Sequence, residues 1–249
     1  MAEFSIETLS EDALLLRLGD RIDAEPNARI HAIAARLRDM TLPGIHDIAP
    51  AYASLLVRFD PFATDGADVL RDSLRKLASE PGVHADTSPR LVEIPVCYGG
   101  EHGVDLQDVA RHAGLDTQQL AARHASMEYR VAMLGFAPGF PYLLGMDPSL
   151  HVPRRATPRT RVPAGSVAIG GTQTGFYPRE LPGGWQLIGR TPLTLFDAQR
   201  DPPCLLAPGD RVRFRAIDAD EFAALTEPAE ERGEGSPLFD LRDQGRSRK

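Results

Sequence analysis

The chain has 249 residues, a net charge of −7 and a mean hydropathy of −0.24, which together indicate a water-soluble globular protein. This acidic balance argues against a general binder of nucleic acids or anionic membranes, because such proteins need a basic surface to displace counterions, but it leaves room for local basic patches. No segment approaches the ~18 apolar residues of a membrane span, no basic stretch precedes the first apolar run, and two cysteines cannot form a disulfide framework, so we expect a cytoplasmic protein.

The first part of the chain predicts a small α+β domain. Strand-like segments alternate apolar and polar residues, and Asp23 can cap the first of two amphipathic helices. The order is strand, strand, helix, strand, strand, helix, at residues 4–9, 13–19, 24–40, 45–49, 52–59 and 69–77. We therefore expect an N-terminal α+β (ββαββα) domain over residues 1–86.

The proline-bounded polar stretch PGVHADTSPR, residues 81 to 90, is typical of a domain boundary. After it come a strand at 90–100 and two short helices, which Asp105 and Asp116 are placed to cap. Residues 135–190 then hold 10 of the 22 glycines and 8 of the 21 prolines between short β-like runs. This pattern predicts a mainly-β barrel domain with elaborate loops over residues 87–226, followed by a polar, mobile tail at 227–249.

The stretch GFAPGFPYLLG, residues 135 to 145, predicts a shaped loop, because glycine opens unusual backbone angles and proline fixes its own φ. The aromatic residues in it can line a binding wall, or they can be pegs that hold the loop on the barrel. The stretch alone favours the pegs.

Arginine usage decides two further points. Two lysines, Lys76 and Lys249, stand against 26 arginines, and neither lies in a phosphate loop, so a Walker-type ATP site on this chain is excluded, as is a biotinylated Met-Lys-Met sequence. Residues 135–190 carry six arginines and two acids. Guanidinium forks suit the recognition of carboxylate or phosphate; the alternative is a solvated loop, which is less favoured for Arg159 and Arg161 because they lie between prolines.

Three single residues are also candidates for a chemical or binding role. His124, on a predicted helix before the strand leading into residue 135, can act as a general acid or base, although its position alone favours a buried, hydrogen-bonded role. Ser166 lacks the G-x-S-x-G elbow of a nucleophile, so it is better explained as a turn residue that can bind an oxygen. Trp185, the only tryptophan, follows two glycines and is interpreted as a loop anchor beside a groove. The histidine and cysteine spacings indicate no metal site.

Long motifs in this region resemble one known family. GFAPGFPYLLG, PRRATPRTRVPAGSVAIGGTQTGFYP and PGGWQLIGRTP are similar to the allophanate hydrolase subunit 1 family, also called the KipI family, whose bacterial members include the B subunit of 5-oxoprolinase. The resemblance runs from about residue 90 to residue 215. It implies that the barrel is cyclophilin-like, in agreement with the residue patterns above.

The resemblance also implies a complex. Proteins of this type join a subunit 2 type barrel protein, which is the C subunit of 5-oxoprolinase, together with the A subunit. The assembled ATP-dependent enzyme opens 5-oxo-L-proline to L-glutamate, so the isolated chain is expected to be inactive and ATP to act at the level of the complex. Arginines would stabilise phosphoryl charge or the substrate carboxylate, and we expect Arg159→Lys to lower turnover with little effect on folding. Phe140, Tyr142 and Trp185 are expected to anchor the partner.

Carried over motif by motif, the resemblance implies three candidate catalytic residues, His124, Arg159 and Ser166. The residues that it implies for binding substrate or partner are Pro138, Gly139, Phe140, Tyr142, Arg155, Gly165, Gln173, Tyr177, Gly184, Trp185 and Arg190. Two alternatives stay open: a binding module that inhibits a histidine kinase, and half of a carboxyltransferase in a biotin-dependent enzyme whose carrier is a separate chain.

Overall fold

The computed structural model describes residues 4–63, 67–80 and 89–226. Contacts between residues divide the chain into two compact units, Met1–Ser88 and Pro89–Lys249. The expected domain boundary at residues 86 and 87 and the expected tail at 227–249 both lie outside the described residues. Among the described residues, no helix is both long enough and apolar enough to span a membrane.

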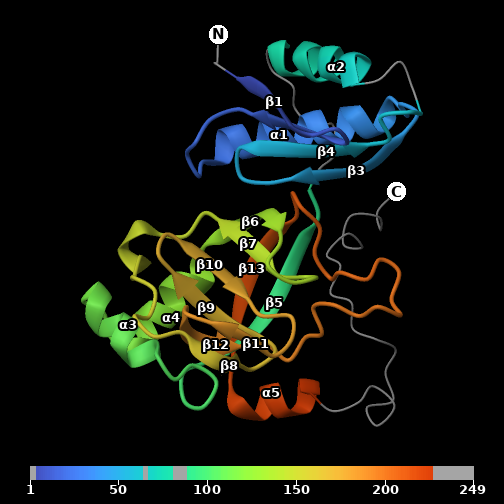
Figure 1. The fold of residues 1–249 in the computed structure, drawn as a ribbon. Coiled ribbons are helices and arrows are strands. Elements are labelled where there is room, and N and C mark those ends of the chain that lie inside the picture. Colours follow the sequence, from blue (N-terminus) through green and yellow to red (C-terminus); the bar gives the residue numbers. More distant parts are fainter. Residues whose placement is uncertain (1–3, 64–66, 81–88, 227–249) are drawn as a thin grey trace, which may run out of the picture. The chain divides into compact units, whose positions relative to one another are not determined.

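The first unit contains one antiparallel sheet of four strands and two helices (Figure 1). The strands lie in the order β1-β2-β4-β3. Their bounds, with those of the helices, are β1 Ser5–Ser10, β2 Ala13–Arg17, α1 Ala24–Asp39, β3 Ile45–Pro50, β4 Ser54–Phe59 and α2 Ala67–Ser79. Both helices contact the sheet and each other, so they cover the same face of it.

Local sequence explains these elements. The Asp23 carboxylate accepts a hydrogen bond of 2.6 Å from the Ala24 amide and caps α1, as predicted. In the neighbouring strands β2 and β4, alternate residues such as Leu14, Leu16, Leu55 and Val57 are fully buried. This period of two turns one face of the sheet toward the helices and builds the core of the unit.

The second unit contains a closed barrel of seven strands, which confirms the predicted barrel. Their order around the barrel is β10-β7-β6-β13-β5-β12-β9, and β13 and β5 form the parallel pair. The barrel strands are β5 Leu91–Tyr98, β6 Glu128–Leu134, β7 Pro141–Leu144, β9 Ser166–Gly170, β10 Gln173–Phe176, β12 Gln186–Arg190 and β13 Arg211–Ile217. Closure pairs the strands all the way round, so the barrel leaves no open sheet edge.

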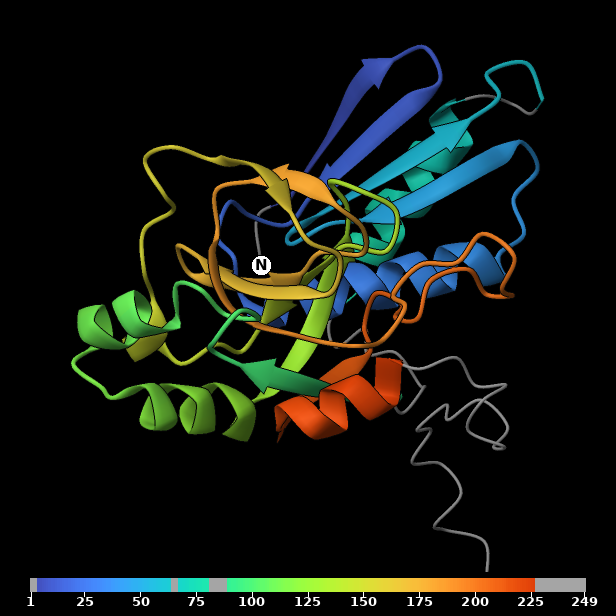
Figure 2. The ribbon, with the colours of Figure 1, turned by 90° about the horizontal axis from the view of Figure 1, so that it is seen from below.

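Smaller elements surround the barrel. A two-stranded sheet is formed by β8 (Arg159–Val162) and β11 (Leu181–Gly183). The other elements are α3 Leu106–Ala113, α4 Thr117–Ser126, the short 3-10 helix η1 Pro148–Leu150 and α5 Ala219–Thr226. Helices α3 and α4 lie side by side on the outside of the barrel (Figure 1, Figure 2). Asp116 caps α4 in a capping box with Gln119, which confirms its predicted role.

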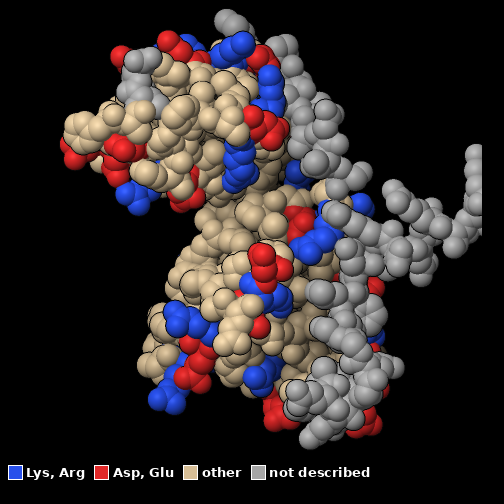
Figure 3. Space-filling model, turned by 90° about the vertical axis from the view of Figure 1, so that its right-hand side faces the viewer, with Lys and Arg blue, Asp and Glu red and all other residues tan. Residues whose placement is uncertain are grey.

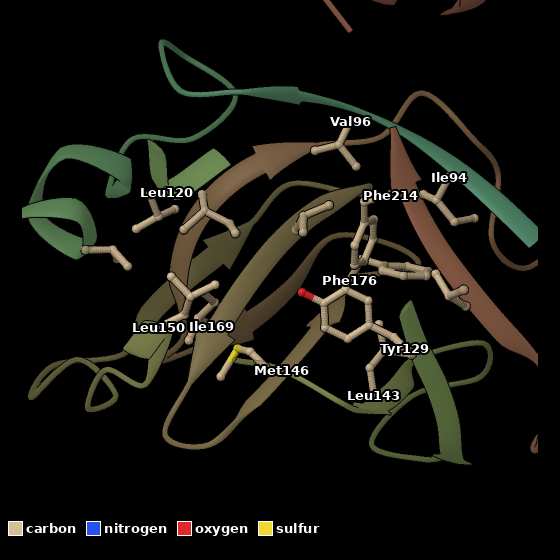
Figure 4. Packing of buried hydrophobic residues seen from close by; sticks show 14 of the residues in the cluster. Ile94, Val96, Leu120, Tyr129, Leu143, Met146, Leu150, Ile169, Phe176 and Phe214 are labelled. Carbon is tan, nitrogen blue, oxygen red and sulfur yellow. The ribbon is translucent and has the colours of Figure 1, made fainter. Parts of the chain in front are cut away.

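The barrel interior is a packed hydrophobic core. Side chains of Ile94, Val96, Phe176 and Phe214 point into the space that the strands enclose (Figure 4). On the face that Figure 3 shows, charges of both signs are interspersed rather than gathered into one patch. The filled interior means that a ligand site has to lie at the rim or on the outer surface of the barrel.

Candidate functional site

One hollow in the barrel unit brings together many of the residues that the sequence indicated. Its volume is about 330 Å³, near the lower end of the range for small-molecule sites. The lining residues are Phe136, Phe140, Tyr142, Arg154, Arg155, Pro158, Tyr177, Pro182, Gly183, Gly184 and Trp185. We call this hollow the aromatic pocket.

Phe140 is the centre of the pocket floor. Its ring centroid lies 5.0 Å from that of Tyr142, 5.2 Å from that of Tyr177 and 5.6 Å from that of Trp185, mostly edge to face. Phe140 is 2% exposed and Trp185 6% exposed, so these rings hold their loops on the barrel and also form the floor of the pocket. The expectation that Phe140 and Trp185 anchor a partner directly is corrected, because rings this buried offer a partner almost no surface; for the half-buried Tyr142 it stays a prediction.

Glycines let the backbone approach these rings. A Cβ atom at Gly183 would lie 2.2 Å from the Tyr177 hydroxyl, and one at Gly170 would lie 2.5 Å from the Trp185 ring. Burial raises the pKa of both Tyr142 and Tyr177, so the phenols stay protonated at neutral pH.

Arginines form one side of the pocket. The Arg154 guanidinium carbon lies 5.7 Å from the centre of the Trp185 ring, within cation–π distance. The neighbouring Arg155 donates its backbone N–H to the Gly184 carbonyl at 2.7 Å. These contacts join the loop before β8 to the loop after β11, so both loops form one continuous wall.

Behind this wall, Asp105 organises two guanidinium groups. Its Oδ1 accepts hydrogen bonds from Arg159 Nη2 at 2.7 Å and from Arg155 Nη1 at 3.3 Å, while its Oδ2 accepts from the Leu187 amide at 2.7 Å. The Asp105 amide in turn donates to the Leu187 carbonyl at 2.9 Å. The predicted capping role of Asp105 is wrong, because its side chain caps no amide of α3 and instead faces the arginines.

The Asp105 cluster, defined as Asp105, Arg155 and Arg159, is not fully satisfied. Arg155 Nε and Arg159 Nη1 are buried, and neither has a hydrogen-bond partner among the described residues. One carboxylate also balances only one of the two guanidinium charges. With Arg154 beside it, this side of the pocket carries excess positive charge, which favours an anionic ligand or partner group.

The turn between β6 and β7 forms another wall. The Gly135 amide donates to the Phe140 carbonyl at 3.1 Å, and the Ala137 amide donates to the Gly135 carbonyl at 2.7 Å. Phe136 at the centre of this tight turn has φ +65°, a conformation that costs a bulky residue on the order of 1 to 3 kcal/mol. The structure therefore holds an aromatic residue in a strained position beside the pocket.

His124 lies elsewhere, in the core between α4 and the barrel. It is fully buried, its ring is stacked 4.6 Å from that of Phe214, and burial lowers its pKa to about 3. The Thr174 hydroxyl donates to the Ala168 carbonyl at 3.0 Å, so it must accept from His124 Nε2–H at 3.0 Å. His124 Nδ1 then accepts from the Tyr98 hydroxyl at 2.8 Å.

This network gives His124 a neutral imidazole with both ring nitrogens satisfied. An imidazole without exposed surface and with a pKa near 3 is poorly suited to exchange protons with a substrate at neutral pH. His124 is also absent from the lining of the aromatic pocket. The position of His124 therefore gives its expected catalytic role no support, and we infer a structural role for it.

Similarity to known proteins extends over most of the chain. A family model described as "Carboxyltransferase domain, subdomain C and D" matches residues 4–206. The chain belongs to this family. The match spans residues of both units, so the family extends beyond the barrel.

Two curated relatives in this carboxyltransferase C/D family are named as the B subunit of 5-oxoprolinase. The one from Bacillus subtilis (strain 168) is 43% identical over 234 residues, which cover 90% of this chain and 97% of the relative. The one from Escherichia coli O157:H7 is 45% identical over 208 residues, covering 83% and 93%. These long alignments agree with the resemblance seen in the motifs.

Solved structures share the fold. TTHA0988 is 42% identical with a TM-score of 0.72; the match covers 83% of this chain but only 40% of that chain. The Kluyveromyces lactis urea carboxylase is 22% identical with a TM-score of 0.68, over 89% of this chain and 22% of that one. This second likeness shows the fold alone. This chain thus corresponds to a part of both larger proteins.

The 14 predicted site residues of this carboxyltransferase C/D chain divide between the aromatic pocket, its surroundings and other parts of the barrel unit. Six of the 14 line the pocket: Phe140, Tyr142, Arg155, Tyr177, Gly184 and Trp185. Arg159 is in the Asp105 cluster, and Gln173 accepts from Arg154 at 3.5 Å. Pro138 and Gly139 lie in the turn before Phe140.

Three predicted residues lie together away from the pocket, where strands β9 and β12 pair: Ser166, Gly165 and Arg190. Ser166 is 2% exposed and pairs with Arg190 across β9 and β12, and the Arg190 Nε donates to the Ala164 carbonyl at 2.7 Å. A Cβ atom at Gly165 would lie 2.3 Å from the Thr191 carbonyl oxygen. The structure places these residues in strand pairing, so the catalytic role expected of Ser166 has no support from its position.

Among the site residues that were not predicted, two stand out, Asp105 and Phe136. Asp105 was interpreted as a helix cap, and nothing local marks the arginines 50 and 54 residues later as its partners. Phe136 was included in the shaped loop without being singled out. Its signal is weak in sequence, because the strain and exposure that distinguish it depend on the folded turn.

Proposed function

We propose that this chain is the B subunit of an ATP-dependent 5-oxoprolinase complex, and that the aromatic pocket contributes to the site of the lactam substrate. The observation that carries the proposal is the match over nearly the whole length of relatives bearing that name. The pocket supports it independently, because a small apolar floor beside unbalanced guanidinium groups suits a compact ring that carries a carboxylate.

The pocket offers the ring and the carboxylate of 5-oxoproline a chemical counterpart. The ring would pack against the half-buried ring of Tyr142, above the floor that Phe140 and Trp185 form. The carboxylate would face the guanidinium group of Arg155, which lines the pocket. These groups bind and orient the substrate, and they lower the cost of negative charge that develops on it.

The complete reaction requires partners under this proposal. Opening the lactam with water is coupled to hydrolysis of ATP to ADP and phosphate, and this chain has neither a phosphate loop nor a lysine suited to one. We therefore assign no ATP contact to its residues and expect the A and C subunits to supply the rest of a cytoplasmic complex. We also propose that the two units are an α+β domain and a cyclophilin-like barrel domain.

Reconstitution tests this proposal. The purified chain is mixed with the A and C subunits, and glutamate formation and phosphate release are measured with and without 5-oxoproline. We expect 5-oxoproline-dependent ATP hydrolysis from the complete mixture and none from this chain alone. Full activity from the A and C subunits without this chain would overturn the proposal.

A second candidate function is half of a biotin-dependent carboxyltransferase. The description of the matched family and the shared fold of the urea carboxylase favour it. A carrier protein would have to bring the biotin, because the chain has no Met-Lys-Met sequence. Transfer of labelled carboxylate from a carboxylated biotin carrier by the reconstituted proteins, with no activity on 5-oxoproline, would favour this function over the first.

A further inference from the structure

Phe136 differs from the other aromatic residues of the pocket because most of its side chain faces solvent. Its exposed fraction is 62%, whereas that of Phe140 is 2%. The two rings meet edge to face with their centroids 5.4 Å apart. An exposed aromatic ring at the border of an apolar hollow is typical of a surface that a partner covers.

The stability of the turn does not require phenylalanine at this position. Phe136 has φ +65°, in the left-handed region that glycine adopts without strain and asparagine tolerates better than other residues. The sequence therefore places an exposed and strained aromatic residue where either of two smaller residues would suit the backbone better. Such a conflict between local preference and sequence marks a position kept for function.

The neighbouring backbone holds Phe136 rigidly. The Phe140 amide donates to the Ala137 carbonyl at 3.0 Å, which closes a second turn through Pro138 and Gly139. Gly139 has φ +79°, and a Cβ atom there would lie 2.8 Å from Phe196 Cβ, so this turn packs closely against the segment at Phe196. A ring presented by a rigid turn loses little conformational freedom when a partner binds it.

The charge beside Phe136 indicates the chemistry of the partner. Arg155, Arg159 and Arg161 each form an ion pair with a carboxylate. Arg154, which lines the same pocket as Phe136, forms none with the described carboxylates. A partner that buries Phe136 would gain a complementary contact by placing an Asp or Glu opposite Arg154.

We propose that Phe136 is the aromatic anchor on which the C subunit of 5-oxoprolinase docks, its ring inserting into an apolar hollow of that protein while a carboxylate of the same protein faces Arg154. This inference rests on the proposed function. It is supported by the exposure of Phe136 at the border of the pocket and by the positive charge of Arg154 beside it. The predicted anchors Phe140 and Trp185 then lie beneath the contact.

Two substitutions test the anchor, because they separate docking from folding. Phe136→Asn and Phe136→Gly relieve the strained φ, so we expect the melting temperature of the isolated chain to rise, or to fall by no more than about 2 °C. The affinity for the purified C subunit, measured by calorimetry, should drop about thirtyfold or more, as for a hot-spot residue. A purely structural residue would instead lower the melting temperature clearly and leave the affinity of the folded fraction unchanged.

A matched control is Phe62→Ala in the first unit, where a phenylalanine 92% exposed is removed from another surface. This variant should bind the C subunit with wild-type affinity. Arg154→Gln should weaken binding about threefold to tenfold and reduce its dependence on salt, since it removes one charge contact.

Several results would overturn the inference. The Phe136→Asn variant could bind the C subunit normally and give the complex a higher KM for 5-oxoproline. That result would mean that Phe136 covers the substrate pocket and does not anchor the C subunit. A wild-type dimer that forms without the C subunit, and that Phe136→Asn dissociates, would make it a contact between copies. If the wild-type chain itself fails to bind the C subunit, the proposed function fails as well, so the two failures can be told apart.

Discussion

The barrel unit contains two buried polar clusters that differ in how completely they are satisfied. Around His124, each hydrogen bond has a donor and an acceptor, the imidazole is neutral, and the pKa lies far below neutrality. Around Asp105, one carboxylate faces two guanidinium groups, and two buried N–H groups have no partner among the described residues.

The difference separates a structural cluster from a candidate functional one. A satisfied neutral network fixes the packing of α4 on the barrel and leaves no donor or acceptor for a ligand. An unbalanced charged cluster is kept at a cost in stability, because buried donors without acceptors are unfavourable. That cost is consistent with a use for the charge, and Arg155 of the cluster lines the aromatic pocket.

The largest expected effect comes from removing the carboxylate. In Asp105→Asn one carboxylate oxygen is replaced by an NH₂ group. The remaining oxygen can accept from the Leu187 amide or from Arg159, and the NH₂ group then lies opposite the other of these two donors. The two guanidinium groups also lose their counter-charge. We expect the free energy of unfolding to fall by about 2 to 4 kcal/mol, measured by urea denaturation of the isolated chain.

Asp108→Asn, in the first turn of the α3 helix that follows Asp105, is the control. Asp108 is exposed and pairs with Arg111 three residues on, so its loss should cost about 0.5 kcal/mol or less. Equal effects of the two substitutions would mean that the Asp105 cluster contributes no more than a surface ion pair, and the contrast between the two buried clusters would then be lost.

Arg159→Lys tests the geometry of the cluster while keeping its charge. Arg159 donates to Asp105 at 2.7 Å, and lysine replaces its planar fork by a single ammonium group. We expect a loss of about 1 to 2 kcal/mol in stability and a roughly tenfold lower turnover in the reconstituted complex, which corresponds to about 1.4 kcal/mol. We expect this loss of stability, rather than the small effect on folding that the sequence indicated, because the side chain of Arg159 is only 23% exposed.

Arg161 supplies the matched control two residues along β8. Its side chain is 81% exposed and lies 3.7 Å from the Glu180 carboxylate, so Arg161→Lys should change stability by no more than about 0.5 kcal/mol. If turnover is unaltered in both variants while the complex is active, the arginines of β8 take no part in the reaction.

The sequence could predict the features that depend on neighbouring residues, but not the contacts between residues far apart in the chain. The barrel and the caps at Asp23 and Asp116 were predictable, because periodicity, glycine and proline placement, and capping depend on neighbours in the chain. The pocket floor was partly predictable, since Phe140, Tyr142 and Trp185 lie in dense motifs. Those motifs indicated a shaped site but could not show which rings are buried.

The role of Asp105 could not be predicted in the same way. Its position before α3 is also that of a helix cap, and local sequence gives the cap no competitor. Only the folded barrel brings β12 and the loop before β8 to the same carboxylate. His124 is the reverse case, a residue expected to be functional that proves to be buried. The motif resemblance indicated function, and its burial follows only from the packing of α4 on β13.

The smallest expected effect concerns the satisfied cluster and appears as a pH dependence. His124 has a folded pKa of about 3, below its usual value of 6.5, so between these values the unfolded chain binds a proton that the folded chain does not. Its contribution to stability is therefore complete above pH 6.5 and is lost as the pH falls toward 3. We expect this one group to lower the free energy of unfolding by about 1.4 kcal/mol between about pH 7.5 and 5.5.

The measurement compares urea denaturation of the wild type with that of His124→Gln at both pH values, because the difference between the two slopes isolates this residue from the carboxylates. Tyr98→Phe is the control: it removes the hydrogen bond to Nδ1 but leaves the imidazole buried, so stability should drop by about 1 kcal/mol while the pH slope stays. Identical slopes in the wild type and in His124→Gln would show that the imidazole takes up its proton in the folded chain. The cluster would then be an accessible acid-base site, and the distinction between the two buried clusters would have to be abandoned.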